Sequence, residues 1–112
     1  MEEVQHDRIT FEYEGTEYIL EFDRETAQKA ELTFDVSMSE LLSGKTAMMY
    51  ALFTAAFMKH HPRIKPTTVR MFWERMPEKQ ELYAALVAMY GNTVGTLLED
   101  PEEGKAISWK MS

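Results

Sequence analysis

Three places in the 112-residue chain carry side chains that could do chemistry, and the first is similar to a phosphate-binding loop. Ser43-Gly44-Lys45-Thr46 matches the end of that motif, whose backbone N–H groups and lysine bind phosphate oxygens. The full motif also needs a glycine where this chain has Ser39, and a buried strand before the loop. The segment therefore predicts a loop that begins a helix, and it argues against nucleotide binding.

The second place is His60-His61, because histidine is a common metal ligand. Neighbouring residues on a helix point about 100° apart, so one metal ion rarely binds both. The chain has no cysteine and no His-Glu-x-x-His spacing that would complete a site. We expect no metal and no cofactor, and we expect the two imidazoles to cap free carbonyl groups at a helix end.

The third place is Glu74, the one carboxylate inside an apolar segment, where it could serve as a general acid or base. Arg70 lies four residues earlier, so an ion pair along a helix is the stronger expectation. No serine has the strand–turn–helix setting of a nucleophile, and the absence of cysteine excludes thiol chemistry and disulfides. The sequence therefore predicts a protein that is not an enzyme.

Charge is unevenly distributed along the chain, which has 19 acidic and 12 basic residues and a net charge of -7. Residues 1–42 carry -9, residues 43–77 carry +5 and residues 78–112 carry -3. The acidic excess argues against binding to nucleic acid or to anionic membrane. The basic middle has two interpretations: neutralisation within the chain, or attraction to an acidic partner or to another copy.

No segment has the character of a targeting signal or a membrane span. The first residues are acidic where a signal peptide is basic and then apolar. The longest apolar run, residues 47–58, is well below the roughly 18–20 residues that span a bilayer. We expect a soluble cytoplasmic protein.

The elements that position these residues differ between the two halves of the chain. Strict alternation of apolar and polar residues around Gly15 predicts an antiparallel β-hairpin over residues 8–23. Asp23 is expected to cap a helix over 24–32, and residues 33–36 could be a third strand or a linker. Ser37 or Ser39 could begin a brief helical turn.

Helical periodicity governs the second half. We predict helices over 46–60, 66–76 and 78–99, the first apolar on nearly every face and hence a central helix or an oligomer seam. Residues 101–112 read as a flexible tail, although the alternation from Ile107 to Met111 could instead pair with the sheet edge. The expected fold is a single α+β domain over residues 1–100, with the hairpin packed on a mainly helical C-terminal half.

Nine methionines are unusual for this length, and six lie between residues 48 and 89 among aromatic residues. Methionine is flexible and suits surfaces that adapt to several partners, although such a stripe is more often core. Both interpretations stay open here. The contact surface that we predict combines apolar side chains with surrounding cations: Met49, Phe53, Phe57, Phe72, Trp73, Lys59, Arg63, Lys65 and Arg70.

The order of elements resembles the tail assembly chaperones of long, non-contractile-tailed bacteriophages. The likeness covers about residues 9–100, through ITFEYEGTEYILEFDRET (9–26), LFTAAFMKHHP (52–62), LYAALVAMY (82–90) and LLED (97–100). The resemblance implies a non-enzymatic protein of the host bacterium's cytoplasm. Such a chaperone coats the apolar tape measure protein until tail-tube subunits replace it, and it is absent from the mature virion.

The resemblance also implies partners and an unusual gene product. The expected partners are the tape measure protein, the major tail tube protein and further copies of the chain. Many such families make a longer product by ribosomal frameshifting, and codons for Glu103-Gly104-Lys105 could contain a slippery run, which the gene sequence would test. The competing interpretation is a small structural or adaptor protein of the phage tail or the head–tail junction.

Overall fold

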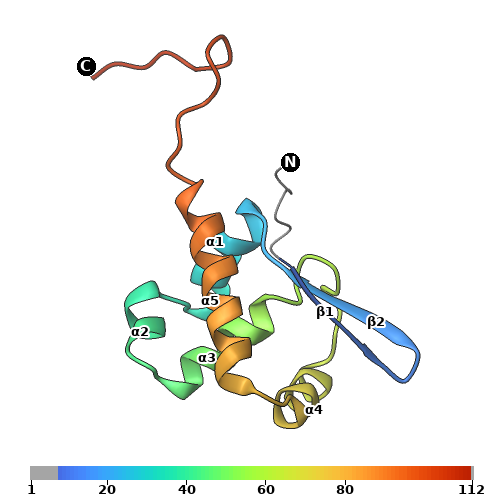
Figure 1. Ribbon diagram of the computed structural model, residues 1–112. Coiled ribbons are helices and arrows are strands. Elements are labelled where there is room, and N and C mark those ends of the chain that lie inside the picture. Colours follow the sequence, from blue (N-terminus) through green and yellow to red (C-terminus); the bar gives the residue numbers. More distant parts are fainter. Residues whose placement is uncertain (1–7, 112) are drawn as a thin grey trace, which may run out of the picture.

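The N-terminal half opens with the predicted β-hairpin, as Figure 1 shows in the computed structural model, which describes residues 8–111. Strands β1 (Arg8–Tyr13) and β2 (Thr16–Glu21) pair antiparallel, with Tyr13 opposite Thr16. The two turn residues, Glu14 and Gly15, have φ angles of 50° and 82°. Two positive φ angles make a type I′ turn, whose twist matches that of the strands.

Helix α1 (Arg24–Phe34) begins where the sequence predicted, at Asp23. The Asp23 carboxylate accepts a hydrogen bond from the Thr26 backbone N–H at 2.8 Å, and the Thr26 hydroxyl accepts one from the Asp23 N–H at 2.8 Å. This reciprocal capping box satisfies two backbone donors at the helix start.

The third strand considered for residues 33–36 is absent from the described chain, where the sheet has two strands. Thr33 and Phe34 instead complete the last turn of α1, and Asp35 ends the helix with a φ of 57°. Phe34 continues the apolar face of the helix and packs against the core. Burial of that ring favours the helix over an extended segment.

Four further helices follow. The second and fourth are several residues shorter than predicted, and the third is one residue shorter. Their bounds are α2 (Met38–Leu42), α3 (Thr46–Ala55), α4 (Pro66–Arg75) and α5 (Lys79–Gly95). Ser37 caps α2 by accepting a hydrogen bond from the Glu40 N–H at 3.2 Å. Helix α5 gives way to a turn after Gly95, so the prediction of a helix to residue 99 was wrong by one turn.

Helix α3 ends five residues before the predicted bound of residue 60, for a reason that lies in the sheet. The chain from Ala56 onward runs beside β2, and the Ala56 carbonyl accepts a hydrogen bond from the Glu21 N–H at 3.0 Å. The ring of His61 accepts a second one from the Ile19 N–H at 3.0 Å. This segment therefore covers the outer edge of β2, which a straight helix could not do.

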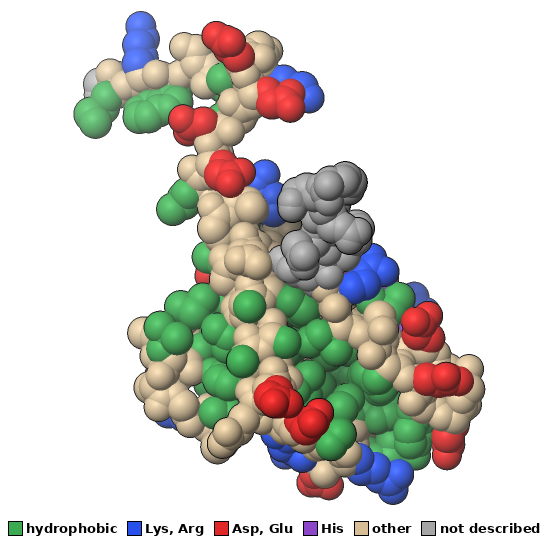
Figure 2. Space-filling view, viewed as in Figure 1, with side chains coloured by type: hydrophobic (Ala, Val, Ile, Leu, Met, Phe, Trp, Pro, Cys, Tyr) green, Lys and Arg blue, Asp and Glu red, His purple; other side chains and the backbone are tan. Residues whose placement is uncertain are grey.

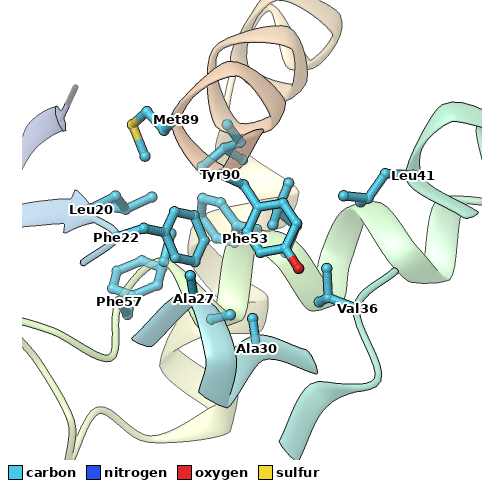
Figure 3. Close-up of a cluster of buried hydrophobic side chains, with 14 of the residues drawn as sticks. Leu20, Phe22, Ala27, Ala30, Val36, Leu41, Phe53, Phe57, Met89 and Tyr90 are labelled. Carbon is cyan, nitrogen blue, oxygen red and sulfur yellow. The ribbon is translucent and has the colours of Figure 1, made fainter. Parts of the chain in front are cut away.

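The core lies between the hairpin, α1, α3 and α5, with α3 at its centre. Figure 3 shows Leu20 and Phe22 from the hairpin side meeting Ala27, Ala30 and Tyr90. Leu52, Phe53 and Phe57 are fully buried beside them. An apolar side chain of this size stabilises the fold by roughly 1.5–3 kcal/mol through burial. The predicted α+β class, a hairpin on a helical C-terminal half, is confirmed.

The last described residues leave this core. Figure 1 shows residues 101–111 extending away from the end of α5. Ile107, Trp109 and Met111 are 87%, 83% and 87% exposed, and no strand forms over them in the described chain. None of the helices within residues 8–111 has the length and apolar character needed to cross a membrane.

Candidate partner-binding surface

An apolar groove lies between α3 and α4, and we call it the α3–α4 groove. Two prolines shape it, because Pro62 lies in the connection and Pro66 begins α4, where a proline loses no helical hydrogen bond. Its volume is about 470 Å³. Its walls are almost wholly apolar and consist of Phe34, Tyr50, Ala51, Thr54, Met58, Pro62, Ile64, Pro66 and Val69.

A second groove, the α3–α5 groove, lies between the start of α3, the end of α4 and the start of α5. Its volume is about 540 Å³, and it is lined by Thr46, Met49, Trp73, Lys79, Gln80 and Tyr83. The Tyr83 hydroxyl donates a hydrogen bond to the Leu41 carbonyl, and burial raises the pKa of this tyrosine. Tyr83 therefore presents its ring to the groove while its polar atom is satisfied behind it.

The two grooves meet at Tyr50 and Trp73, whose ring centroids are 6.3 Å apart. The Arg70 guanidinium carbon lies 4.0 Å from the centroid of the Tyr50 ring, and Lys79 Nζ lies 5.8 Å from that of Trp73. Such contacts hold a cation over an aromatic face while leaving its charge available to solvent. We call both grooves together the α3–α4 surface: apolar along its length and cationic at its rim.

The predicted contact residues divide between this surface and the core beneath it. Met49 and Trp73 line the α3–α5 groove as half-buried side chains. Phe53, Phe57 and Phe72 do not line a surface, since their exposed fractions are 0%, 0% and 3%. Figure 3 shows Phe53 and Phe57 within the buried cluster. The three phenylalanines pack in the core beneath the two grooves.

The four predicted cations are also placed differently from one another. Lys59 forms an ion pair with Glu21, with Nζ 3.4 Å from the carboxylate. Arg63 and Lys65 are exposed in the connection to α4, beside the α3–α4 groove, and Arg70 stacks on Tyr50. Among the residues that the structure describes, these three form no ion pair. Their charges are therefore available to an acidic partner.

Glu21 shows that part of the basic middle is neutralised within the chain. Besides Lys59, its carboxylate contacts Arg8 at 3.2 Å and His60 at 2.7 Å. Burial alone would raise the pKa of Glu21, but the hydrogen bond from His60 and the charges of Lys59 and Arg8 outweigh it and lower that pKa. The acidic head and the basic middle thus attract each other here, while the cations beside α4 remain unpaired with acids.

The histidines do not cap a helix, so that prediction was wrong. His61 accepts a hydrogen bond from the Ile19 N–H through Nε2, and its pKa is lowered by burial and by the neighbouring His60. His60 turns to Glu21 instead. Across residues 8–111, no group of three or more histidine and acidic residues could hold a metal ion. The pair fastens the connection after α3 to strand β2.

The structure also shows how the other two chemical candidates are placed. Gly44 has a φ of 83°, and α3 begins at Thr46, which confirms the predicted loop at a helix start. Lys45 pairs with Glu40 at 3.5 Å. The predicted pair between Arg70 and Glu74 does not form in the described structure, because Arg70 lies over Tyr50.

Several residues of the surface were missed by the sequence prediction, notably Tyr50, Ile64 and Tyr83. Tyr50 and Met58 belong to the methionine and aromatic residues between residues 48 and 89, a pattern that fits a core as well as a surface. The two prolines around Ile64 were a usable signal, because a segment held between Pro62 and Pro66 cannot fold back into either helix. Tyr83 carried no such signal, since its neighbours come from distant segments.

Comparisons with known proteins give one family and no closer relative. Neither a curated protein nor a solved structure matches the chain. A family model matches residues 4–112, which is nearly the whole sequence. The chain therefore belongs to the family described as Domain of unknown function (DUF5055).

Proposed function

We propose that this chain is a non-enzymatic phage tail assembly chaperone, which binds the tape measure protein and keeps it soluble during tail assembly. Two supports are independent of each other. One is the resemblance of residues 9–100 to that chaperone family. The other, which carries the proposal, is the α3–α4 surface: two joined apolar grooves with unpaired cations at the rim.

A long helix with an exposed apolar face fits this surface. Apolar side chains at i, i+3, i+4 and i+7 form a stripe that docks into hydrophobic grooves. Met49 and Met58 are flexible, so the grooves can accept different side chains from successive segments of the partner. Arg63, Lys65 and Arg70 would meet acidic residues beside that stripe.

The acidic excess of the chain serves the same role. A tape measure helix exposes apolar faces that would aggregate if left bare. A coat of subunits with a net charge of -7 each repels other coated molecules. In this proposal the protein acts in the cytoplasm of the host bacterium, and tail-tube subunits later displace it.

Co-expression with the tape measure protein encoded in the same phage genome tests the proposal. A fragment of the tape measure protein, expressed together with this chain, is expected to move from the insoluble to the soluble fraction and to co-purify with the chain. A fragment that stays insoluble and brings down no complex would exclude the chaperone function. The control is the fragment expressed with an unrelated acidic protein of similar size, which should leave it insoluble.

Mass spectrometry of purified phage particles separates the proposal from the competing one. A chaperone should be missing from the particle, because tail-tube subunits have replaced it. A structural or adaptor protein of the tail or the head–tail junction would instead be present at a fixed number of copies per particle.

A further inference from the structure

Strand β1 has an open edge. Because Tyr13 and Thr16 flank a two-residue turn, residues 9, 11 and 13 bond to β2, and the backbone groups of Thr10 and Glu12 point away from it. The outer edge of β2 is covered by bonds to Ala56 and His61. The outward backbone groups of Thr10 and Glu12 have no hydrogen bond to any described residue. An unpaired edge of this kind is a template for a further strand.

A groove runs along this open edge. It lies between β1 and the start of α5, and its volume is about 420 Å³. Figure 2 shows hydrophobic side chains gathered on this face, between α5 and the hairpin. The groove is lined by Ile9, Thr10, Phe11, Met76, Pro77, Glu78, Glu81, Leu82 and Ala85. A strand added to β1 would place alternate side chains against this lining.

The C-terminal segment of the chain has the matching pattern. From Ile107 to Met111 it alternates, so that Ile107, Trp109 and Met111 fall on one face of an extended chain. These three side chains are more than four-fifths exposed, which is costly for large apolar groups unless something covers them. No other part of the described chain has three large, exposed apolar side chains at alternate positions.

Charge points to the same pairing. Besides Glu21, which pairs with Arg8, Lys59 and His60, the hairpin and the groove carry five carboxylates, from Glu12, Glu14, Glu17, Glu78 and Glu81. The C-terminal segment carries Lys105 and Lys110 and no acid from residue 105 onward. Opposite charges on an edge strand and its partner favour pairing and suppress pairing of two hairpins with each other.

We propose that residues 105–111 of one copy add to strand β1 of a second copy, with Ile107 and Trp109 against the groove. The segment extends away from the end of α5 and its apolar side chains are exposed, so it does not occupy the groove beside the start of α5 in the same chain and is free to reach a second copy. Each copy then offers one edge and one segment, so copies associate head to tail.

Light scattering coupled to size exclusion tests this without any tape measure protein, so its failure is distinguishable from failure of the proposed function. Wild-type protein is expected to have a mass above that of one 13.1 kDa chain. Removal of residues 105–112 should reduce it to one chain. The double substitution Ile107→Ser/Trp109→Ser should do the same, and it cannot unfold the core because both residues are exposed.

Blocking the edge gives the reciprocal variant. Thr10→Pro removes an outward N–H and no bond to β2, so it should also give one chain, whereas Thr10→Val keeps the N–H and should associate like wild type. Circular dichroism confirms that Thr10→Pro is folded. If it is not, Glu12→Pro takes its place, because its N–H also points outward.

A mixture of two variants tests whether the edge and the segment bind each other. Thr10→Pro retains the segment and lacks the edge, and the truncated chain retains the edge and lacks the segment. Each alone should be one chain, and the mixture should form a one-to-one pair. Wild-type protein that stays a single chain at high micromolar concentration, a truncated chain that still associates, or a mixture that forms no pair would each overturn the proposal. Packing of the segment on its own hairpin would give the first result, a wild-type protein that stays a single chain, even if the mixture formed a pair.

Discussion

His60 and His61 are adjacent in sequence and do different work, which shows how strongly individual side chains depend on partners far along the chain. His60 contacts the Glu21 carboxylate, and His61 accepts the Ile19 N–H. Both contacts lie about 40 residues away in sequence, at separations of 39 and 42. From the sequence alone, a helix end was the nearest source of partners, so the local prediction was wrong.

The role of His61 predicts a pH dependence of stability. Its Nε2 must be unprotonated to accept the Ile19 N–H, and its pKa is lowered in the folded state by burial and by His60. The unfolded chain therefore binds this proton more readily, so stability is full above about pH 6.5 and is lost as the pH falls below that value. His61→Gln keeps an acceptor and does not titrate. Urea unfolding at about pH 7 and pH 5 should show a smaller loss for the variant than for wild type.

Arg63→Gln is the matched control, because Arg63 is exposed and should leave the wild-type loss unchanged. An equal loss in His61→Gln and wild type would contradict this assignment. A second loss at lower pH is expected from Glu21, whose lowered pKa makes its ionised form a source of stability that disappears on protonation.

The sequence placed Phe53 in a partner-binding surface, whereas the structure buries it in the core. This difference predicts a large effect of Phe53 on stability. Its side chain is fully buried. Its ring centroid lies 5.1 Å from that of Phe57 and 5.0 Å from that of Trp73. Phe53→Ala should lower the free energy of unfolding by about 3–5 kcal/mol, because it leaves a cavity. Leu32→Ala, at a residue that is 85% exposed, should change it by less than about 0.5 kcal/mol. Equal effects of the two, measured by urea unfolding, would contradict the assignment of Phe53 to the core.

Elements were predictable where their signals are local. Asp23 marked the start of α1 and Gly15 the hairpin turn, and of the two serines considered for the start of α2 the structure uses Ser37, because each acts through backbone groups within three residues. The ends of α1 and α3 were not predictable in the same way. Thr33 and Phe34 are helical because the half-buried ring of Phe34 packs against the core, and α3 stops because its following residues cover the edge of β2. Both causes are tertiary contacts.

The hairpin turn carries a testable strain. Glu14 has a φ of 50°, which costs free energy for a residue with a Cβ atom, and asparagine tolerates this conformation best after glycine. Glu14→Asn should raise the free energy of unfolding by about 0.5–1 kcal/mol. Glu14→Val, β-branched and ill suited to positive φ, should lower it. Thermal unfolding measures both, and a stabilising valine would show that the turn is not type I′.

At the scale of the whole molecule, the residues predicted to form one contact surface divide between the two grooves and the core. Met49, Trp73 and Arg70 do lie together, because α3 and α4 pack side by side. The three phenylalanines belong to the inner face of the same helices. Helical spacing alone cannot tell an inner apolar face from an outer one when a helix is apolar nearly all round.

The charge pattern also gains meaning only at this scale. The acidic N-terminal part and the basic middle of the chain attract each other at Glu21, whose carboxylate contacts Lys59 and His60. The cations beside α4 and the carboxylates around β1 remain separate, on the two surfaces for which we propose different occupants. One surface suits an acidic amphipathic helix, and the other suits a short basic strand.

The most direct test of the central claim is the amount of tape measure fragment kept soluble by two matched double variants. Met49→Glu/Ile64→Glu places a charge in each groove of the α3–α4 surface. Leu32→Glu/Leu42→Glu places the same charges on exposed residues outside both grooves. Circular dichroism first confirms that both variants are folded. We expect the first variant to keep at least tenfold less tape measure fragment soluble than wild type does, and the second to keep as much soluble as wild type. Equal recovery with both variants would contradict the account, because the tape measure protein would then bind elsewhere.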